Sequence, residues 1–193
     1  MQPHFLFNSL NSLSELIDAD MPEAASMTAR LADLYRHILE NSKEKTTTLA
    51  SELAIIRDYL ELERLRFGKR LQFVIKSEVD ERSVFVPSLI LQTLVENAVK
   101  HGISPSIGGG EIEIKATLSS NKWMTIEVLN SGSPPKPSKD GASQGANKST
   151  GTGLANAKER LTLMYGENHG FYFGLDANGR TIARFSVSGA KLG

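Results

Sequence analysis

The hydrophobic pattern of this 193-residue chain changes its period near residue 70, and this change limits the folds that it can adopt. Up to residue 68, apolar residues recur every three or four positions, as on one face of a helix. From Leu71 onward, several segments alternate apolar and polar residues, as in half-buried strands. Helices followed by strands mixed with two further helices predict an α+β fold, in which helices cover one face of a sheet.

The first 68 residues predict three helices. A first helix follows Pro3, a second starts near Pro22, and a third runs over 49–68, where Gly68 can end it. Residues 41–48 are predicted to be a polar connection between the second and the third helix. The apolar stripes that define these helices consist of Leu6, Leu10, Leu13 and Ile17; Ala24, Met27, Leu31, Leu34 and Ile38; and Leu49, Leu53, Ile56 and Leu60.

Beyond residue 70, the pattern predicts strands joined by turns, together with two helices and a long loop. Asn178 and Gly179 form a hairpin turn between the last two strands. Residues 131–150 are rich in Gly, Pro, Ser and Lys, so they predict either a flap over a ligand or a surface segment without structure. The strands are expected at 71–76, 111–118, 122–129, 171–175 and 180–187, and the helices at 87–100 and 153–165.

Composition excludes several classes of function. Lys plus Arg and Asp plus Glu number 22 each, so no net charge attracts nucleic acid or an anionic membrane. The chain has no cysteine, which excludes disulfides and thiol catalysis and fits a reducing compartment. It also lacks the run of about 18 apolar residues that a membrane-spanning helix needs. Because it begins inside an amphipathic helix, with no signal peptide before it, we expect a piece of a longer protein.

Helical spacing places a histidine on the polar face of the first helix. His4, Asn8, Asn11 and Glu15 lie together, opposite the apolar stripe. An exposed imidazole has a reference pKa of about 6.5, so it is largely neutral at pH 7 and available as a nucleophile. Taken alone, such a histidine is more often an ordinary surface residue.

Residues 96–102 (ENAVKHG) combine groups that can hold a nucleotide. Asn97 and Lys100 are three residues apart and share a helix face, with Glu96 beside them. An amide oxygen suits Mg²⁺, which is usually shared with substrate phosphates, and an ammonium group neutralises a phosphate oxygen. The alternative is a polar helix edge whose lysine extends into solvent.

Residues 151–156 (GTGLAN) place two glycines at the expected start of a helix. Glycines there let free backbone N–H groups approach an anion, which the helix dipole also favours. The segment is not a dinucleotide fingerprint, because Asn156 replaces the third glycine, and it is not a Walker P-loop. By itself a glycine pair is weak support for phosphate binding.

Taken together and in this order, these segments resemble the LytS/YehU-type sensor histidine kinases, and the resemblance extends over essentially the whole chain. Residues 3–8 (PHFLFN) resemble the phospho-acceptor segment of that family, and residues 96–102 resemble its N box. Residues 151–156 with 159–161 resemble its second glycine box. Residues 59–63 and 66–67 match the helix that precedes the ATPase domain in that family.

The resemblance implies a fold and a domain arrangement. Residues 1–68 would form a helical phospho-acceptor and dimerisation region. Residues 69–193 would form a Bergerat-type (GHKL) ATP-binding domain, an α/β sandwich with a mixed sheet covered by helices on one face. Its lid would lie at about 131–150.

The resemblance also implies roles for individual residues. ATP would phosphorylate His4, and Asn8, one turn away, would orient the imidazole or a water for dephosphorylation. Asn97 would hold Mg²⁺ against the phosphates, and Glu96 would be the nearest candidate for a base. The residues that would bind the nucleotide are Asn97, Lys100, His101, Asn130, Gly132, Gly151, Thr152, Gly153 and Leu154.

Three positions depart from related patterns. Asn130 stands where Bergerat domains usually carry an aspartate that accepts from the adenine amino group; its amide oxygen can accept that bond, but its NH₂ group could misread the base. Phe5 follows His4, where many other histidine kinases have an acidic residue. Thr93 stands four residues before Asn97, where ATP-hydrolysing relatives often carry a catalytic glutamate, which favours transfer to histidine over hydrolysis.

The resulting hypothesis is ATP-dependent autophosphorylation of His4, followed by transfer to an aspartate of a response regulator. The family resemblance suggests a regulator with LytTR-type output, a homodimer through the N-terminal helices, and a cytoplasmic position in a membrane sensor protein. We expect no nucleic-acid partner and no membrane contact within these residues. Two alternatives remain: a nucleotide-gated interaction module that forms no phosphohistidine, and a protein that mainly dephosphorylates its regulator, as Asn8 suggests.

Overall fold

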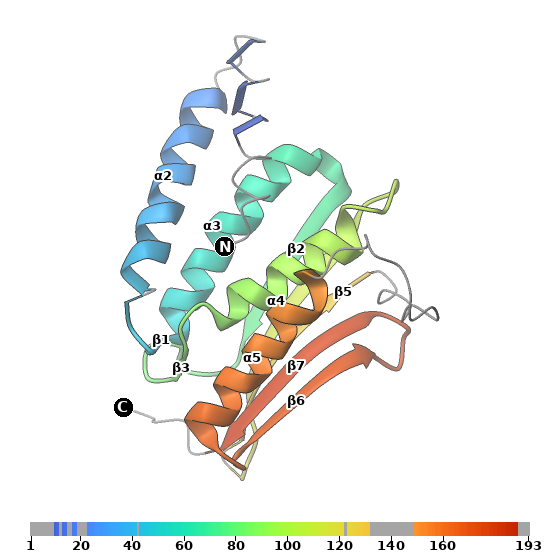
Figure 1. The fold of residues 1–193 in the computed structure, drawn as a ribbon. Helices are drawn as coiled ribbons and strands as arrows, with labels where there is room; N and C mark the ends of the chain where they lie inside the picture. Colours follow the sequence, from blue (N-terminus) through green and yellow to red (C-terminus); the bar gives the residue numbers. More distant parts are fainter. Residues whose placement is uncertain are drawn as a thin grey trace.

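The computed structural model describes residues 10–11, 13–14, 17–18, 23–41, 43–121, 123–131 and 149–188. Within this part of the chain, helices pack against a large five-stranded sheet. A second, two-stranded sheet lies at the ends of these helices (Figure 1). The elements are α2 (Glu23–Asn41), β1 (Thr46–Thr48), α3 (Leu49–Phe67), η1 (Gly68–Arg70), β2 (Leu71–Ser77), β3 (Phe85–Pro87), α4 (Ile90–Ala98), η2 (Val99–Ile103), β4 (Gly110–Leu118), β5 (Trp123–Asn130), α5 (Ser149–Tyr165), β6 (His169–Leu175) and β7 (Thr181–Ser188).

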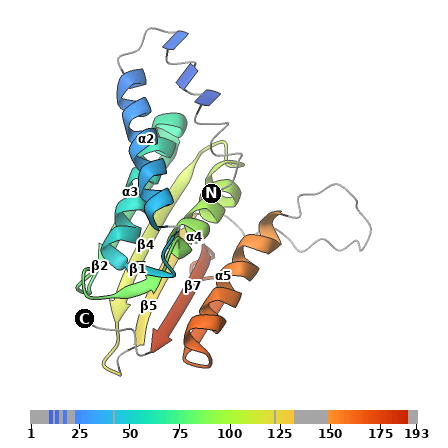
Figure 2. The ribbon, with the colours of Figure 1, turned by 60° about the vertical axis from the view of Figure 1, so that its left-hand side comes forward.

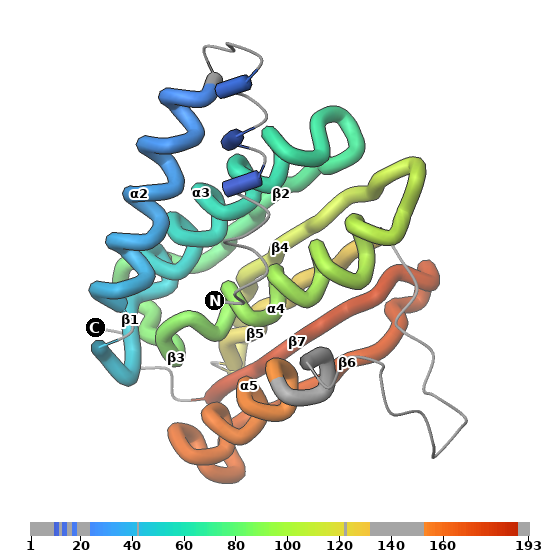
Figure 3. Tube along the Cα trace, turned by 45° about the horizontal axis from the view of Figure 1, so that its top comes forward, coloured from blue at the N-terminus to red at the C-terminus, as the bar shows by residue number. Residues whose placement is uncertain are grey.

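The large sheet has five strands in the order β2-β4-β5-β7-β6. Strands β2 and β4 are parallel because α4 lies in the crossover between them, whereas the other neighbouring strands are antiparallel. Helices α3, α4 and α5 lie on the same face of this sheet, and α2 packs along α3 (Figures 2 and 3). The structure therefore confirms the predicted α+β architecture, with a mixed sheet covered by helices on one face.

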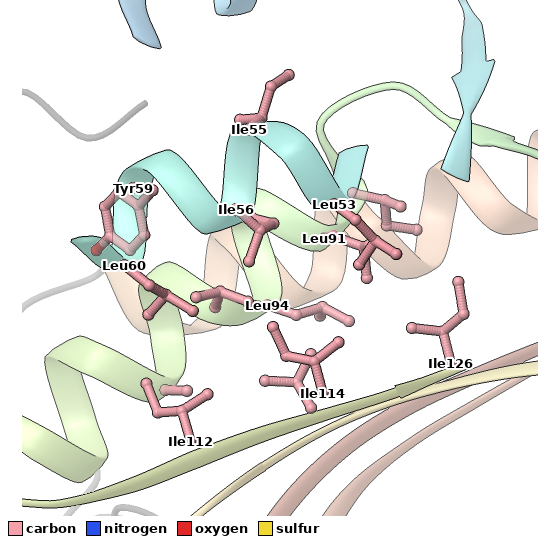
Figure 4. Packing of buried hydrophobic residues seen from close by; sticks show 14 of the residues in the cluster. Leu53, Ile55, Ile56, Tyr59, Leu60, Leu91, Leu94, Ile112, Ile114 and Ile126 are labelled. Carbon is pink, nitrogen blue, oxygen red and sulfur yellow. The ribbon is translucent and has the colours of Figure 1, made fainter. Parts of the chain in front are cut away.

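The core fills the layer between these helices and the sheet. Alternate residues of β4, β5 and β7 point toward the helices, and α3 and α4 direct their apolar faces back at them. Burying each leucine or isoleucine stabilises the fold by about 1.5–3 kcal/mol, so this layer dominates the stability. Buried members include Leu53, Ile56, Leu60, Leu91, Leu94, Ile112, Ile114 and Ile126 (Figure 4), and the same cluster extends to Met27 and Leu34 of α2.

Local sequence determines both ends of α3. The Thr48 hydroxyl accepts a hydrogen bond from the backbone N–H of Ser51 at 3.2 Å, which caps the first turn. Gly68 adopts a φ of 58°, a left-handed conformation that glycine tolerates at a helix end. The predicted third helix is confirmed, and so is the hairpin of β6 and β7 around Asn178 and Gly179.

The segment before α4 corrects two predictions. Pro87 ends a short strand, β3, that pairs antiparallel with β1, so the segment 41–48 is not only a polar connection. The helix expected from residue 87 begins at Ile90, because Leu89 takes a left-handed conformation with φ 61° and ψ 20°. The carboxylate of Glu52 on α3 then accepts hydrogen bonds from the N–H groups of Leu89 at 2.6 Å and Leu91 at 3.1 Å. The residues around Leu89 could not predict this cap, because the carboxylate that accepts these hydrogen bonds belongs to another helix.

The start of α5 corrects a third prediction. The helix begins at Ser149, so Gly151 and Gly153 lie inside it instead of preceding it, and the first two helical residues fall in the predicted loop 131–150. Gly151 and Thr152 still belong to the first turn, whose backbone N–H groups have no partner within the helix. The backbone N–H groups that an anion site needs are therefore still present at the start of α5.

The face of the sheet opposite the helices carries charged side chains that pair across strands. Glu113 of β4 contacts the Nζ atoms of Lys76 at 2.8 Å and Lys115 at 3.2 Å, and the guanidinium of Arg180 at 3.1 Å. Hydrogen bonds from Lys76 first, and then from Arg180 and Lys115, lower the pKa of Glu113 to about 2 despite its burial. None of the helices in the described ranges is long and apolar enough to cross a membrane.

Candidate nucleotide-binding site

Two segments that are distant in sequence meet at the end of α4, and α5 approaches the same helix one turn earlier. The two segments are the turn at the end of α4 and the end of β5. A Cβ atom added at Gly102 would lie 2.1 Å from Nδ2 of Asn130, and one added at Gly153 would lie 3.5 Å from Cγ2 of Thr93. The turn that carries Gly102 therefore lies against Asn130, and Gly153 of α5 lies near Thr93 on α4, one helical turn before Asn97.

Helix α4 does not end where its sequence pattern predicts but continues as the π-helical turn η2. The backbone N–H of Ser104 donates to the carbonyl of Val99 at 2.8 Å, a five-residue spacing. Lys100, His101 and Gly102 lie on this turn. Single π-turns within α-helices are frequent at functional sites, and their wider backbone presents side chains at angles that an α-helix does not offer.

Asn97 is the predicted metal ligand, and it lies buried near the end of α4. Among the described residues, no group of three or more His, Cys, Asp or Glu side chains could hold a metal ion. A cation here would therefore have few protein ligands. This donor set fits Mg²⁺, which keeps several waters and shares its coordination with substrate phosphates.

His101 carries a buried ring nitrogen without a partner. Within the described part of the chain, its Nε2 atom has no hydrogen bond. Burial, and to a smaller extent the neighbouring charge of Lys100, lower the pKa of His101 below its usual range. The imidazole is therefore neutral at pH 7, and Nε2 can donate to or accept from a bound ligand, depending on the tautomer.

Asn130 ends β5 on the face that the helices cover. Its register partners are Ile112 on β4 and Thr181 on β7, and it is buried. Gly102 leaves room for its side-chain amide, since any other residue there would overlap it. The hydroxyl of the next residue, Ser131, accepts a hydrogen bond from the N–H of Glu111 at 2.8 Å and fixes the strand end.

Glu96, the predicted base, is buried and faces other helices. Gln92 donates a hydrogen bond from Nε2 to its Oε1 at 2.8 Å. Burial and then the charge of Glu96 raise the pKa of Tyr35 on α2. Glu96 also contributes, after burial and Glu63, to the raised pKa of Tyr59 on α3. Its carboxylate is therefore close to both α2 and α3.

The structure brings together part of the predicted site. Asn97 lies near the end of α4, Lys100 and His101 lie on η2, and Asn130 contacts Gly102 of the same turn, whereas α5 approaches α4 at Thr93. Gly151 and Thr152 are described as helical backbone, and Gly153 and Leu154 are half-buried. His4, Asn8 and Gly132 lie outside the described residues. No role was predicted for Gly102, although a glycine directly after polar residues can indicate a close approach of another segment.

This fold is that of the catalytic domain of histidine kinases. The catalytic domain of the histidine kinase ThkA superposes with a TM-score of 0.54 at 17% identity, over 74% of this chain and 93% of that one. The histidine kinase AdeS of Acinetobacter baumannii superposes with a TM-score of 0.51 at 14% identity, over 95% of this chain and 94% of that one. At these identities, the likeness shows the fold alone.

Sequence comparison extends the match to the family. Residues 1–71 match the family model described as histidine kinase. The chain is 31% identical to the sensor histidine kinase/phosphatase LytS of Staphylococcus aureus (strain MRSA252), over 94% of this chain. This chain is therefore similar to sensor histidine kinases of the LytS type over nearly all of its length. It spans about a third (32%) of the length of that relative.

Proposed function

We propose that this chain is the phospho-accepting and ATP-binding part of a two-component sensor histidine kinase. It transfers the γ-phosphoryl group of ATP to His4 and then to an aspartate of a response regulator. The observation that supports the proposal is the close approach of Gly102, on the turn that follows Asn97, to Asn130, in a chain whose residues 1–71 match the histidine kinase family model.

Each predicted residue has a role in nucleotide binding. Asn97 holds Mg²⁺, which neutralises phosphate charge when bound. Lys100 and His101 contact phosphate oxygens, and Asn130 accepts a hydrogen bond from the amino group of adenine. The backbone N–H groups in the first turn of α5 bind an anion with the help of the helix dipole. The remaining members of the site, Gly132, Gly151, Thr152, Gly153 and Leu154, form the lid and its base.

The chemistry consists of positioning and charge stabilisation. A neutral ring nitrogen of His4 attacks the γ-phosphorus in line; an N–P bond forms, the bond to the bridging oxygen breaks, and ADP leaves. Glu96 stabilises or accepts the proton of the other ring nitrogen, and Asn8 orients the ring. Lys100 offsets the charge that develops on the phosphoryl oxygens.

The proposed partners are a second copy of the chain and a response regulator, with LytTR-type output. Leu10 and Ile17 of the first apolar stripe are largely exposed in the single chain, whereas Leu13 packs against the core. A second copy that covers these two side chains would form a dimer through the N-terminal helices. The proposed location is the cytoplasmic part of a membrane sensor.

Incubation with γ-labelled ATP and Mg²⁺ tests the proposal. We expect label that survives alkali, is lost in acid and maps to His4. The variant His4→Gln should lose the label and keep its nucleotide affinity, because His4 does not bind the nucleotide. Retained label in that variant would contradict the assignment. Nucleotide binding without label, in this chain and in a longer form extended before residue 1, would favour the nucleotide-gated interaction module.

A second candidate function is dephosphorylation of the regulator. The relative LytS is described as a kinase and phosphatase, and Asn8 lies one predicted helical turn from His4, where it could orient a water. Faster decay of a phosphorylated regulator in the presence of this chain, and slower decay with Asn8→Ala, would support this function.

A further inference from the structure

The peptide group just before α4 is held by side chains from two other helices. The carbonyl oxygen of Ser88 accepts a hydrogen bond from Nη2 of Arg160 on α5 at 2.6 Å. The N–H of Leu89, which belongs to the same peptide group, donates to Oε1 of Glu52 on α3 at 2.6 Å. The C=O and N–H bonds of a trans peptide point in opposite directions, so Arg160 and Glu52 hold this group from opposite sides.

The surroundings of this peptide group make the contact with Arg160 important. Ser88 is 2% exposed and Glu52 is 1% exposed, so the peptide group lies away from bulk water. A hydrogen bond from a guanidinium group is charge-assisted and stronger than one between neutral groups. Leu89 also has a φ of 61°, which is uncommon for a residue with a side chain, so the turn depends on contacts that hold it. Helix α5 is therefore joined to α4 at a defined point.

A second contact between α5 and α4 depends on the same turn. The Thr93 hydroxyl donates a hydrogen bond to the carbonyl oxygen of Leu89 at 3.1 Å, which fixes the direction of the Thr93 methyl group. A Cβ atom added at Gly153 would lie 3.5 Å from this methyl carbon, Cγ2. The absence of a side chain at Gly153 thus lets the beginning of α5 come close to α4.

The contacts along α5 together define its position relative to α4, which lies beside it (Figure 1). Near the other end of α5, the Tyr165 hydroxyl donates to the carbonyl oxygen of Phe85 at 3.4 Å. The contacts follow one another in opposite chain directions: Gly153, Arg160 and Tyr165 lie near Thr93, Ser88 and Phe85, respectively. Among these three contacts, that of Arg160 is the short, charge-assisted hydrogen bond, so it contributes most to fixing α5 along its axis.

The position of α5 determines where its first turn lies. Arg160 follows Gly151 by about 13 Å along a helix with a rise of 1.5 Å per residue, so a shift at Arg160 moves the first-turn N–H groups equally. A misplacement of about 1 Å can weaken a precise interaction strongly. We propose that Arg160 is a positioning residue that sets the position of α5 along α4 and thereby places its first-turn N–H groups against the nucleotide phosphates. The phosphate part rests on the proposed function, whereas the helix position does not.

A disulfide introduced between α4 and α5 measures the helix position without any nucleotide. Because the chain has no cysteine, Thr93→Cys combined with Gly153→Cys adds a single pair of thiols. The short distance at this point suits a disulfide, so the pair should form one readily under mild oxidation. Arg160→Gln, whose shorter amide cannot reach the Ser88 carbonyl, should slow its formation about fivefold. Lys158→Gln removes the same charge from an exposed position of α5 and should keep the wild-type rate.

Nucleotide affinity separates positioning from a general loss of structure. In chains without added cysteines, Arg160→Gln should weaken binding of a non-hydrolysable ATP analogue about tenfold, as measured by calorimetry. Adenosine has no phosphate, so its affinity, measured by NMR titration, should change less than about twofold. Lys158→Gln should bind both molecules as the wild type does. Arg160→Lys keeps the charge and one donor, so its affinity and disulfide rate should lie between those of the wild type and Arg160→Gln.

The two measurements distinguish this inference from the proposed function. Circular dichroism establishes which variants fold, and Arg160→Lys provides the test if Arg160→Gln does not. Wild-type disulfide rates and analogue affinity in every folded Arg160 variant would overturn the inference, and so would an equal loss of affinity for adenosine and for the analogue. Failure of the wild-type chain to bind the analogue would instead contradict the proposed function, and the disulfide rates would still decide whether Arg160 positions α5.

Discussion

The pKa of a buried glutamate is shifted in opposite directions in two regions of the molecule. On the helix side, Glu52 is 1% exposed, and burial raises its pKa to about 7, although two backbone N–H groups and the charge of Arg160 oppose the rise. On the open face of the sheet, Glu113 is 7% exposed, and hydrogen bonds from Lys76, Arg180 and Lys115 lower its pKa to about 2. The exposed fractions are similar but the shifts are opposite, because burial is the largest cause for Glu52, whereas hydrogen bonds from three cations outweigh burial for Glu113.

The helix layer and the open face of the sheet therefore differ in how their carboxyl groups respond to pH. The carboxyl group of Glu52 in the helix layer, whose pKa is about 7, is close to protonation near neutral pH and so responds to its surroundings. The carboxylate on the sheet face stays ionised over the whole physiological range and joins neighbouring strands. A carboxyl group of the helix layer can therefore change its protonation near pH 7, whereas the ion pairs of the open face stabilise the sheet.

The largest expected difference comes from replacing one glycine near the candidate site and one glycine of the sheet with alanine. Gly102→Ala places a Cβ atom against Asn130, so we expect a loss of about 1–3 kcal/mol in the free energy of unfolding and at least tenfold weaker ATP binding. Gly170 on β6 has no atom within 4 Å of an added Cβ, so Gly170→Ala should change neither quantity noticeably. Denaturant unfolding and calorimetric ATP titration measure both. Equal tolerance at the two positions would contradict the close contact between Gly102 and Asn130.

A smaller effect should appear in the pH dependence of stability. The pKa of Glu52 is raised from 4.5 to about 7, so its contribution is present below pH 4.5 and is lost as the pH rises through 7. The pKa of Glu113 is lowered from 4.5 to about 2, so its contribution is present above pH 4.5 and is lost as the pH falls toward 2.

Glutamine variants isolate these two contributions. Glu52→Gln should flatten the stability curve between pH 4.5 and 7, and Glu113→Gln should flatten it between pH 4.5 and 2, each by roughly 1–2 kcal/mol. Denaturant unfolding at several pH values provides the curves. Flattening in the same pH window for both variants would show that the two faces do not differ as described.

The smallest effect concerns an exposed pair on the open face. Arg184 contacts Glu127 at 2.8 Å and lies over the ring of Tyr172, but its side chain is 44% exposed. Arg184→Ala should therefore lower the free energy of unfolding by less than about 1 kcal/mol, and less still in 1 M salt. A larger or salt-independent loss in thermal unfolding would mean that the packing of the guanidinium matters more than its charge.

The sequence was sufficient where neighbouring residues determine the structure. Gly68 marks the end of α3, and the Asn178–Gly179 turn pairs β6 with β7, both as predicted. It was insufficient where a distant group decides. The start of α4 depends on Glu52, which lies 37 residues before Leu89.

The same distinction holds for the candidate site. Asn97 and Lys100 were named from a motif and Asn130 from the family resemblance, and the structure places Asn130 against the turn that follows Asn97. The π-helical η2 turn and the contact of Gly102 with Asn130 depend on how α4 meets β5, which no periodicity reveals. Nor did the sequence indicate that Glu96 faces α2 and α3, because that orientation follows from the packing of three helices.

The cap that Glu52 supplies to α4 also has a mechanical meaning. Two hydrogen bonds join the first turn of α4 to Glu52 in the N-terminal half of α3, so the two helices are connected directly and not only through the sheet beneath them. A displacement of α3 would therefore act first on the N-terminal end of α4, which is the end farther from Asn97.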